Sequence, residues 1–414
     1  MVRATARITV KGVFKKSKTK EHAAPRIRNG TPPRWRILPP EIIHIIVNLL
    51  KHDKRTLRAC SLAAREFSQA ALSCIGQHIT VNHVPRIKQC MKLLTVHSAF
   101  QHVRSLDLGV TSKSSNSKDH LEEQLAILEI FAQRQTLTCL WLSNVPFPSI
   151  EPSQRGKIRD IVTALGSTVN NLGLYGCRFS SYTDMISFIR AFPRCDTLYI
   201  RDCVTGGKDS TESTFSGLPE HKLSLGVLEL TSASSNGLIA DVSSSIENAT
   251  LDISRLSALT CSVESTEQAQ CVATAASASP IQHFQLTCTE PGGFQAFLNP
   301  MKKWPLESLT IGPISHATDR AYWHDAFQNF QTVPRLKELT IIYYYPNLNT
   351  FDVNCWGYFD SLFCRRDIFP RLRQVNIRIT IQSSPPNRKQ EEALLSTLYS
   401  IRRFLRVTFW GKRE

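Results

Sequence analysis

The sequence predicts an α/β protein in which a short helical domain precedes a solenoid of parallel strands alternating with helices. Three observations predict this architecture. A dense apolar helical pattern begins abruptly at residue 38, a six-residue apolar frame recurs ten times between residues 103 and 377, and several segments between the frames have helical periodicity. With 414 residues, 42% of them hydrophobic, the chain is long enough to bury a sizeable core.

Residues 1–37 are expected to form a flexible basic tail. They hold 11 Lys and Arg against the single acid Glu21, and they lack any hydrophobic period. Three interpretations of the tail stay open: a nuclear import signal in the lysine-rich run at 15–20, a mitochondrial presequence, or a solvated tail without an address.

A helix is expected to begin at Pro40. A proline at the first helical position needs no hydrogen-bond donor, and Glu41 in the first turn complements the helix dipole. The apolar residues of this segment recur at helical spacing but cover much more than one stripe: Ile42, Ile43, Ile45, Ile46, Val47, Leu49 and Leu50. Such a helix needs partners on two sides.

Two further helices are expected before residue 77. Asp53 can cap a second helix that runs from Lys54 to about Phe67, and a third short helix would end near Gly76. Three short helices bury little among themselves, so an apolar face that stays open is more readily a docking surface than part of a self-sufficient core. The alternative is that residues 38–76 simply cap the domain that follows.

Residues 38–76 resemble an F-box of the style common among fungal F-box proteins. The resemblance is carried by Leu38-Pro39-Pro40-Glu41-Ile42, by Asp53, and by the ending Cys60-Ser61-Leu62 followed by Arg65 and Phe67. The chain departs from the family at Ala63-Ala64, where Val-Cys is usual, and at Phe67, where Trp is usual. Smaller residues there imply thinner packing of the second helix.

The resemblance implies a module that docks on the Skp-family adaptor of a cullin-RING (SCF) ubiquitin ligase. By their positions in the motif, the adaptor-facing residues would be Leu38, Pro39, Glu41, Ile42, Ile45 and Leu49. The resemblance assigns the motif's own packing, or its edge, to Leu57, Cys60, Leu62 and Phe67.

From residue 103 a frame of the form apolar-x-x-apolar-x-apolar recurs about every 30 residues. The ten frames begin at Val103, Leu137, Val169, Cys195, Leu225, Leu256, Ile281, Leu306, Leu336 and Leu372. Each frame predicts a short strand with alternate residues buried, and helical patterns follow at 121–133, 182–192 and 390–401. Stacked at this period, the units resemble a degenerate leucine-rich repeat over residues 100–380. A doubly wound α/β domain is the alternative.

The expected boundaries follow from these patterns. Residues 77–102 would be a linking strand and helix, and residues 103–400 the repeat domain. Residues 401–414, with five Lys and Arg against Glu414, are expected to be a basic C-terminal tail.

Side chains between the buried positions are expected to line the exposed concave face of the sheet. Aromatic residues and arginine carry much of the energy of protein interfaces. The candidate target-binding residues on three neighbouring frames are therefore Trp141, Tyr175, Tyr199 and Arg201. The alternative is that they are ordinary exposed strand residues, aromatic only because strands favour aromatics.

Sequence patterns for catalysis are missing. No common hydrolase, zincin, dinucleotide or EF-hand pattern occurs, and the twelve cysteines contain no Cys-x-x-Cys pair, so neither a cofactor nor a metal is expected. The cysteines are expected to be reduced and mostly buried. No apolar stretch of 18 residues and no secretory signal is found, which argues against a membrane span and against secretion.

The net charge of +16 lies at the chain ends, since residues 38–400 hold 34 basic and 32 acidic residues. This distribution argues against nucleic-acid binding by the body of the protein. The sequence thus predicts a non-catalytic receptor in the cytoplasm or nucleus, with an F-box for the Skp-family adaptor and cullin and a repeat domain for an unidentified protein target. A scaffold outside ubiquitin transfer, or a nucleic-acid-associated protein acting through its basic tail, are the alternatives.

Overall fold

The computed structural model describes residues 38–50, 53–63, 65–81, 103–109, 117–206, 221–231, 251–288, 291–315, 333–345, 356–381 and 405–411, together with 90, 214, 215, 217, 218, 392 and 395–398. The basic tail at 1–37, most of 82–102 and most of 390–401 lie outside this set. The chain divides into two compact units, Met1–Val145 and Pro146–Glu414.

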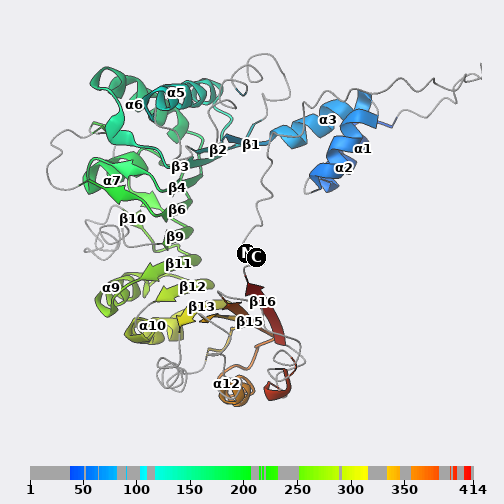
Figure 1. Ribbon diagram of the computed structural model, residues 1–414, viewed down its shortest axis with the longest axis vertical. Helices are drawn as coiled ribbons and strands as arrows, with labels where there is room; N and C mark the ends of the chain where they lie inside the picture. The colour runs from blue at the N-terminus through cyan, green and yellow to red at the C-terminus, as the bar shows by residue number, and fades with distance from the viewer. Residues whose placement is uncertain are drawn as a thin grey trace, which may run out of the picture. The chain divides into compact units, whose positions relative to one another are not determined.

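The first unit holds short helices followed by parallel strands (Figure 1). Its elements are α1 (Pro40–Leu49), α2 (Lys54–Ala63), α3 (Arg65–Gly76), β1 (His78–Val81), β2 (Ser105–Gly109), α5 (Ser117–Arg134) and β3 (Cys139–Ser143). The strands pair in the order β1-β2-β3, all parallel. The three helices expected before residue 77 are present, but α2 ends at Ala63, so Phe67 belongs to α3.

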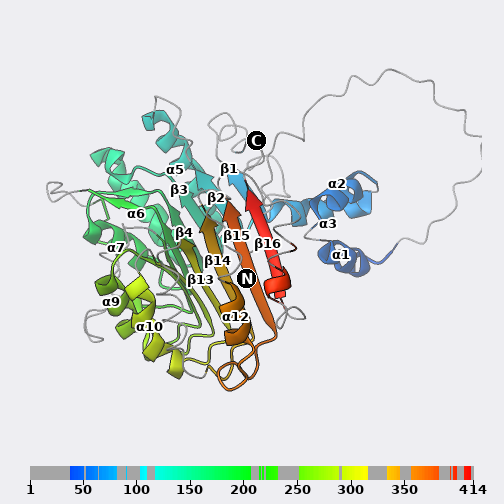
Figure 2. The ribbon, with the colours of Figure 1, turned by 60° about the horizontal axis from the view of Figure 1, so that its bottom comes forward.

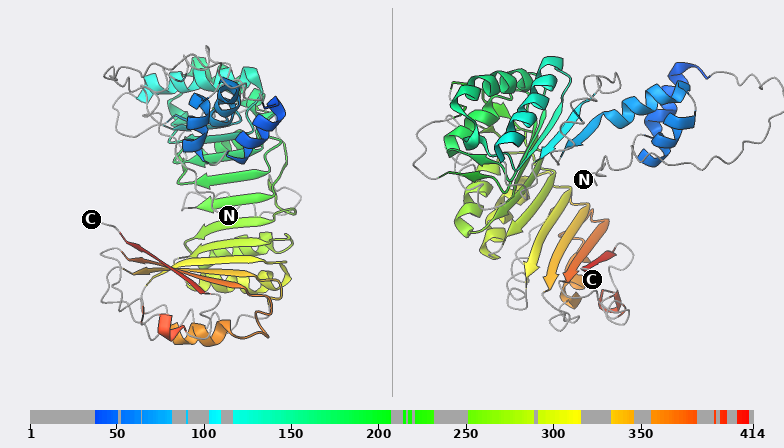
Figure 3. Two further views of the ribbon diagram at one scale, coloured as in Figure 1. Left: turned by 90° about the vertical axis from the view of Figure 1, so that its right-hand side faces the viewer. Right: turned by 45° about the horizontal axis from the view of Figure 1, so that its top comes forward.

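The second unit continues the alternation of strands and helices (Figures 1 and 3). Its long strands are β4 (Asn171–Tyr175), β6 (Thr197–Arg201), β9 (Val227–Thr231), β11 (Ala258–Val263), β12 (His283–Cys288), β13 (Ser308–Ser315), β14 (Glu338–Tyr345), β15 (Gln374–Ile381) and β16 (Leu405–Gly411). Its helices are η3 (Phe147–Ser149), α6 (Pro152–Gly166), α7 (Tyr182–Arg190), α9 (Thr266–Ala276), α10 (Pro291–Lys303) and α12 (Trp356–Phe363). Short parallel pairs join β5 (Arg178–Phe179) to β7 (Val204–Thr205), and β8 (Leu223–Ser224) to β10 (Leu251–Asp252).

The long strands of this unit are parallel and lie in chain order, as β4-β6-β9-β11-β12-β13-β14-β15-β16. Helices α7, α9 and α10 lie along one side of them (Figure 1). A doubly wound sheet reverses its strand order at a switch point. The described strands of each unit follow chain order without such a reversal, so the doubly wound alternative is wrong, and the fold is α/β with a large parallel sheet.

All ten apolar frames coincide with strands. The first, fourth and sixth side chain of every frame is buried, each 2% exposed or less. The fourth residues also face one another in register across neighbouring strands, as in the run Leu172, Leu198, Leu228, Leu259, Phe284, Leu309, Leu339 and Val375. The core is therefore a ladder of equivalent side chains.

A repeated hydrogen bond holds this register. The carbonyl of the second frame residue accepts from two successive amides of the next repeat. The Asp196 carbonyl, for example, accepts from the Gly226 and Val227 amides at 2.9 and 3.0 Å. The same pair of hydrogen bonds recurs in each repeat from the Asn170 carbonyl to the amide of Gln374. In every repeat the two donors are the amides of the second and third frame residues, where the strand begins. Because a carbonyl oxygen has two lone pairs, one group per repeat satisfies two donors.

Aromatic side chains fill the space between strands and helices. Phe147 packs against Phe179, Phe188 and Phe215 with ring centroids 4.8 to 5.2 Å apart, and all four are fully buried. Farther along the chain, Trp304 packs on Phe284 at 5.2 Å and donates from Nε1 to the Ala276 carbonyl at 3.0 Å. The helical faces expected at 121–133 and 182–192 are likewise buried.

The structure corrects the expected C-terminal tail. Residues 405–411 form β16, which pairs with β15 from Leu405↔Val375 to Gly411↔Ile381 (Figure 2). The sequence does not show this frame because Arg402 stands at its first position, where the other frames have an apolar residue, and basic residues surround the alternating Leu405 and Val407. At the other end, β1 has Gly76 at that position, yet Ile79 and Val81 are buried against β2.

The core ladder gives a first prediction. Leu228→Ala should lower the free energy of unfolding by about 2–5 kcal/mol, because Leu228 is buried between Leu198 and Leu259 and its loss leaves a cavity. Val227→Ala is the matched control, since Val227 is the neighbouring residue on the opposite face and only half-buried. It should cost about 1 kcal/mol or less. Urea denaturation followed by circular dichroism measures both; equal losses would contradict the assignment of the two faces.

Candidate protein-binding surfaces

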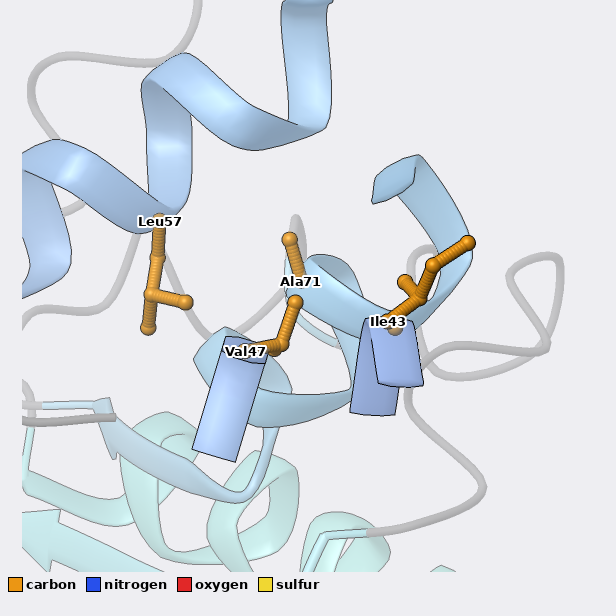
Figure 4. Packing of buried hydrophobic residues seen from close by; sticks show 5 residues of the cluster. Ile43, Val47, Leu57 and Ala71 are labelled. Carbon is orange, nitrogen blue, oxygen red and sulfur yellow. The ribbon is translucent and has the colours of Figure 1, made fainter. Parts of the chain in front are cut away.

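Helix α1 has two apolar faces, as expected from its sequence. It begins at Pro40 with Glu41 in its first turn, and Pro39 precedes it without a side-chain cap. One face points into a small core: Ile43 and Val47 are buried together with Leu57 of α2 and Ala71 of α3 (Figure 4). This inner face holds the three helices together.

The other face of α1 is exposed. Leu38 is 41% exposed, Ile42 42%, Ile45 55% and Leu49 79%. At 100° per residue, Ile42, Ile45 and Leu49 fall within one stripe on the helix, and Leu38 lies two residues before its first residue. We call Leu38, Ile42, Ile45 and Leu49 the outer face of α1. The remaining two adaptor-facing candidates, Pro39 and Glu41, are also exposed, so the structure gathers all six candidates at the start and along one side of α1.

Exposed apolar side chains concentrate in this helical region. Among the described residues, the large apolar side chains with the greatest exposure are Leu38, Ile42, Ile45, Leu49, Leu62, Leu72, Tyr175 and Val204. Six of these eight lie between residues 38 and 76. Leu62 is 87% exposed and makes no part of the helical core, whereas Leu57 is buried and Cys60 and Phe67 pack against the core.

Asp53 holds the start of α2. Its carboxylate Oδ1 accepts from the backbone amides of Arg55 and Thr56, both at 3.1 Å, and its Oδ2 accepts from the Thr56 hydroxyl at 2.6 Å. The hydrogen bonds from Thr56, chiefly that from its hydroxyl, lower the pKa of Asp53 below its ordinary value. The expected helix cap is therefore confirmed.

Three of the four target-binding candidates come together on β4 and β6. Tyr175 faces Arg201 in the strand register, and the guanidinium Cζ of Arg201 lies 5.4 Å from the centroid of the Tyr175 ring. Both side chains are exposed. Tyr199, two residues earlier on β6, is half-buried and faces Glu229 of β9. We call Tyr175, Tyr199, Arg201 and Glu229 the aromatic patch.

The charges of the patch are partly balanced. Arg201 Nε lies 3.5 Å from Asp202 Oδ2, and the two side chains are 61% and 50% exposed. Burial raises the pKa of Glu229, and the positive charge of Arg201 opposes that shift. The tyrosine rings can bind a partner through apolar contacts, and the exposed guanidinium can bind it through hydrogen bonds.

The fourth candidate, Trp141, lies on β3 in the first unit. It is half-buried, and its Nε1 donates to Cys139 Sγ at 3.1 Å. On that strand it faces Asp107 of β2. Trp141 is thus a strand residue of the first unit, and the aromatic patch is made by residues of the second.

Metal sites, disulfides and membrane spans do not occur in the described part of the chain. There, no group of three or more His, Cys, Asp or Glu side chains is arranged to hold a metal ion. Every described cysteine is a free thiol, and Cys177, Cys195, Cys203, Cys261 and Cys288 are buried. Within the same residues, no helix combines the length and apolar character needed to cross a membrane.

Comparison with known proteins adds no assignment. No protein-family model matches the chain, and no curated protein matches it.

The capping contacts of Asp53 predict a local, pH-dependent effect. Asp53→Ala should speed amide exchange in α2 at neutral pH, because the amides of Arg55 and Thr56 lose their acceptor. Asp53→Asn, which keeps a capping oxygen, should largely preserve the protection. Hydrogen–deuterium exchange of the full-length protein, read on the α2 peptides, measures both.

The sign of the pH effect follows from the lowered pKa. A carboxylate whose pKa is lower in the folded state stabilises that state above its unfolded pKa, near 3.8, and the benefit is lost as pH falls through the folded value. Wild-type α2 should therefore lose protection at acidic pH, after correction for intrinsic exchange. The Asp53→Asn protein should lose less. The same acid response in both would contradict a role for the charge.

Proposed function

We propose that this chain is an F-box protein that acts as a non-catalytic substrate-recognition subunit of an SCF-type cullin-RING ubiquitin ligase. Its helices at 38–76 would dock on the Skp-family adaptor, and its strand–helix region, a degenerate leucine-rich repeat, would bind a protein target. The observation that carries the proposal is the exposed outer face of α1. It holds the apolar residues at which the F-box resemblance puts the adaptor.

The energetics of α1 support docking by this face. Fully burying a Leu or Ile side chain contributes roughly 1.5–3 kcal/mol relative to leaving it exposed. Three such side chains in one helical stripe, with Leu38 just before the helix, form a surface of the kind that inserts into a hydrophobic groove. The inner face, with Ile43 and Val47, is already used by the helical core, so the outer face is free to bind a partner without unfolding the module.

The aromatic patch is the proposed target surface. It combines tyrosine and arginine, which are enriched among residues that dominate binding energy. Its mechanism requires no catalysis by this chain. A target held on the repeat region would meet the activated ubiquitin as an intramolecular event, at high effective concentration, so that moderate affinity suffices.

Adaptor docking gives a direct test. Ile45→Glu should abolish or strongly reduce recovery of the Skp-family adaptor and cullin in a pulldown, because a charge would enter the apolar contact. Val204→Glu is the matched control, since Val204 is 53% exposed and Ile45 55%. It lies on β7 and should leave recovery unchanged. Undiminished recovery with Ile45→Glu, or no adaptor with the wild type, would contradict the proposal. The chain would then be interpreted as a scaffold that acts outside ubiquitin transfer.

Target binding is tested separately. A Tyr175→Ala/Arg201→Ala protein should lose proteins that accumulate on the wild type when the proteasome is inhibited, because the stacked pair is removed. The same variant should recover the adaptor at the wild-type level. Affinity purification with quantitative mass spectrometry measures both. If the double variant keeps every inhibitor-dependent partner, the aromatic patch is not the target surface.

A further inference from the structure

A cluster of cations lies where the chain enters β14 and β15. The turns before these strands have nearly the same sequence, Pro334-Arg335-Leu336-Lys337 and Pro370-Arg371-Leu372-Arg373. In both turns the leucine is buried and its amide donates to the carbonyl three residues earlier. We call Arg335, Lys337, Arg371 and Arg373 the basic row.

The strand register brings the four cations of the basic row together. Glu338 faces Gln374, and the amide of Arg373 donates to the Lys337 carbonyl at 2.9 Å, so Lys337 and Arg373 lie side by side where the chain enters the two strands. Arg335 and Arg371 stand at the equivalent place two residues earlier. Neighbouring strands are about 4.8 Å apart, so the basic row is compact. Figure 2 shows β14 and β15 side by side.

The acidic groups nearby neutralise the basic row only in part. Glu307 pairs with Lys337 at 2.7 Å, and hydrogen bonding by Lys337, with the charges of Lys337, His283 and Arg335, lowers the pKa of Glu307. Two other carboxylates are engaged elsewhere: Asp367 pairs with Arg365 at 2.6 Å, and Glu338 accepts from Asn376 Nδ2 at 2.8 Å.

Arg371 and Arg373 are exposed, and neither makes an ion pair or side-chain hydrogen bond to another described residue. Arg366 adds positive charge beside them, because its Nη1 donates to the Leu372 carbonyl at 3.2 Å. At least two guanidiniums of this surface therefore keep their full capacity to bind an anion.

We propose that the basic row binds an acidic segment of a partner protein, with glutamate or aspartate at alternate positions. Guanidinium groups bind carboxylates through two parallel hydrogen bonds. Alternate side chains of an extended segment project on the same side, so a segment with acidic residues at alternate positions can present several carboxylates to the basic row at once. The surface is independent of adaptor docking and of the aromatic patch.

The size of the basic row favours a short protein segment over a nucleic acid. Proteins that bind duplex nucleic acid through phosphates typically make on the order of 6–10 such contacts. The basic row has four cations, and Lys337 is already paired. Residues 38–400 are also nearly balanced in charge, so the basic row is a local cluster and not part of a long basic surface of the kind that binds nucleic acid.

The test measures binding of a short fluorescent peptide of alternating Glu and Ser to the full-length protein by anisotropy. Arg371→Glu/Arg373→Glu should weaken binding about fivefold or more, since two attractive contacts become repulsive. Arg194→Glu/Arg255→Glu is the matched control: it changes the net charge equally, and both arginines are exposed and precede the first residue of a frame. It should stay within about twofold of the wild type. Circular dichroism verifies that both variants are folded.

Four further probes complete the design. A peptide with Gln in place of Glu should not bind, and Arg371→Gln/Arg373→Gln should give an intermediate loss. The proposal is overturned if the Glu peptide does not bind the wild type, or if the matched control loses as much affinity. It is also overturned if only a phosphoserine peptide or a single-stranded RNA binds, because the basic row would then be a phosphate site.

Discussion

Register between successive repeats is the constraint on which the rest of the structure depends. One carbonyl per repeat takes two amides from the next, and so sets the residue at which each strand begins. With that residue set, the fourth and sixth frame positions stack on their counterparts and stay dry. A slip of one residue would turn the apolar set outward and the polar set inward. The hydrogen bond and the apolar ladder therefore specify the same register. A shift in register would break both the hydrogen bonds and the apolar contacts.

The same constraint creates the surfaces. Because equivalent frame positions line up, side chains far apart in the sequence become neighbours: Tyr175 meets Arg201 at the ends of β4 and β6, and Lys337 lies between Glu307 and Arg373 at the entry to β14 and β15. Repetition of the backbone leaves the exposed positions free to vary. A patch of stacked aromatic and cationic groups can form on one pair of strands, and a row of unneutralised arginines on another, without disturbing the core.

Helix α1 differs from the repeats because it has apolar residues on two faces. A surface helix needs one apolar stripe, and this one has two. Ile43 and Val47 stabilise the three-helix core, whereas Ile42 and Ile45 add nothing to it and remain in water. This exposed apolar stripe beside a satisfied core is the observation on which the proposed docking surface rests. The cap at Asp53 serves the core, since it fixes the start of the helix that carries Leu57.

The sequence by itself determined the ten frames, the start of α1 and the cap of α2, because periodic burial and unsatisfied helix ends leave local patterns. It did not reveal β1 and β16, since Gly76 and Arg402 interrupt the frame, and an edge strand needs fewer buried residues than a central one. Nor did it reveal which face of α1 is buried, because contact with Leu57 and Ala71 decides that. The basic row likewise depends on tertiary structure: Arg335 and Arg371 belong to different repeats, and only strand register makes them one surface.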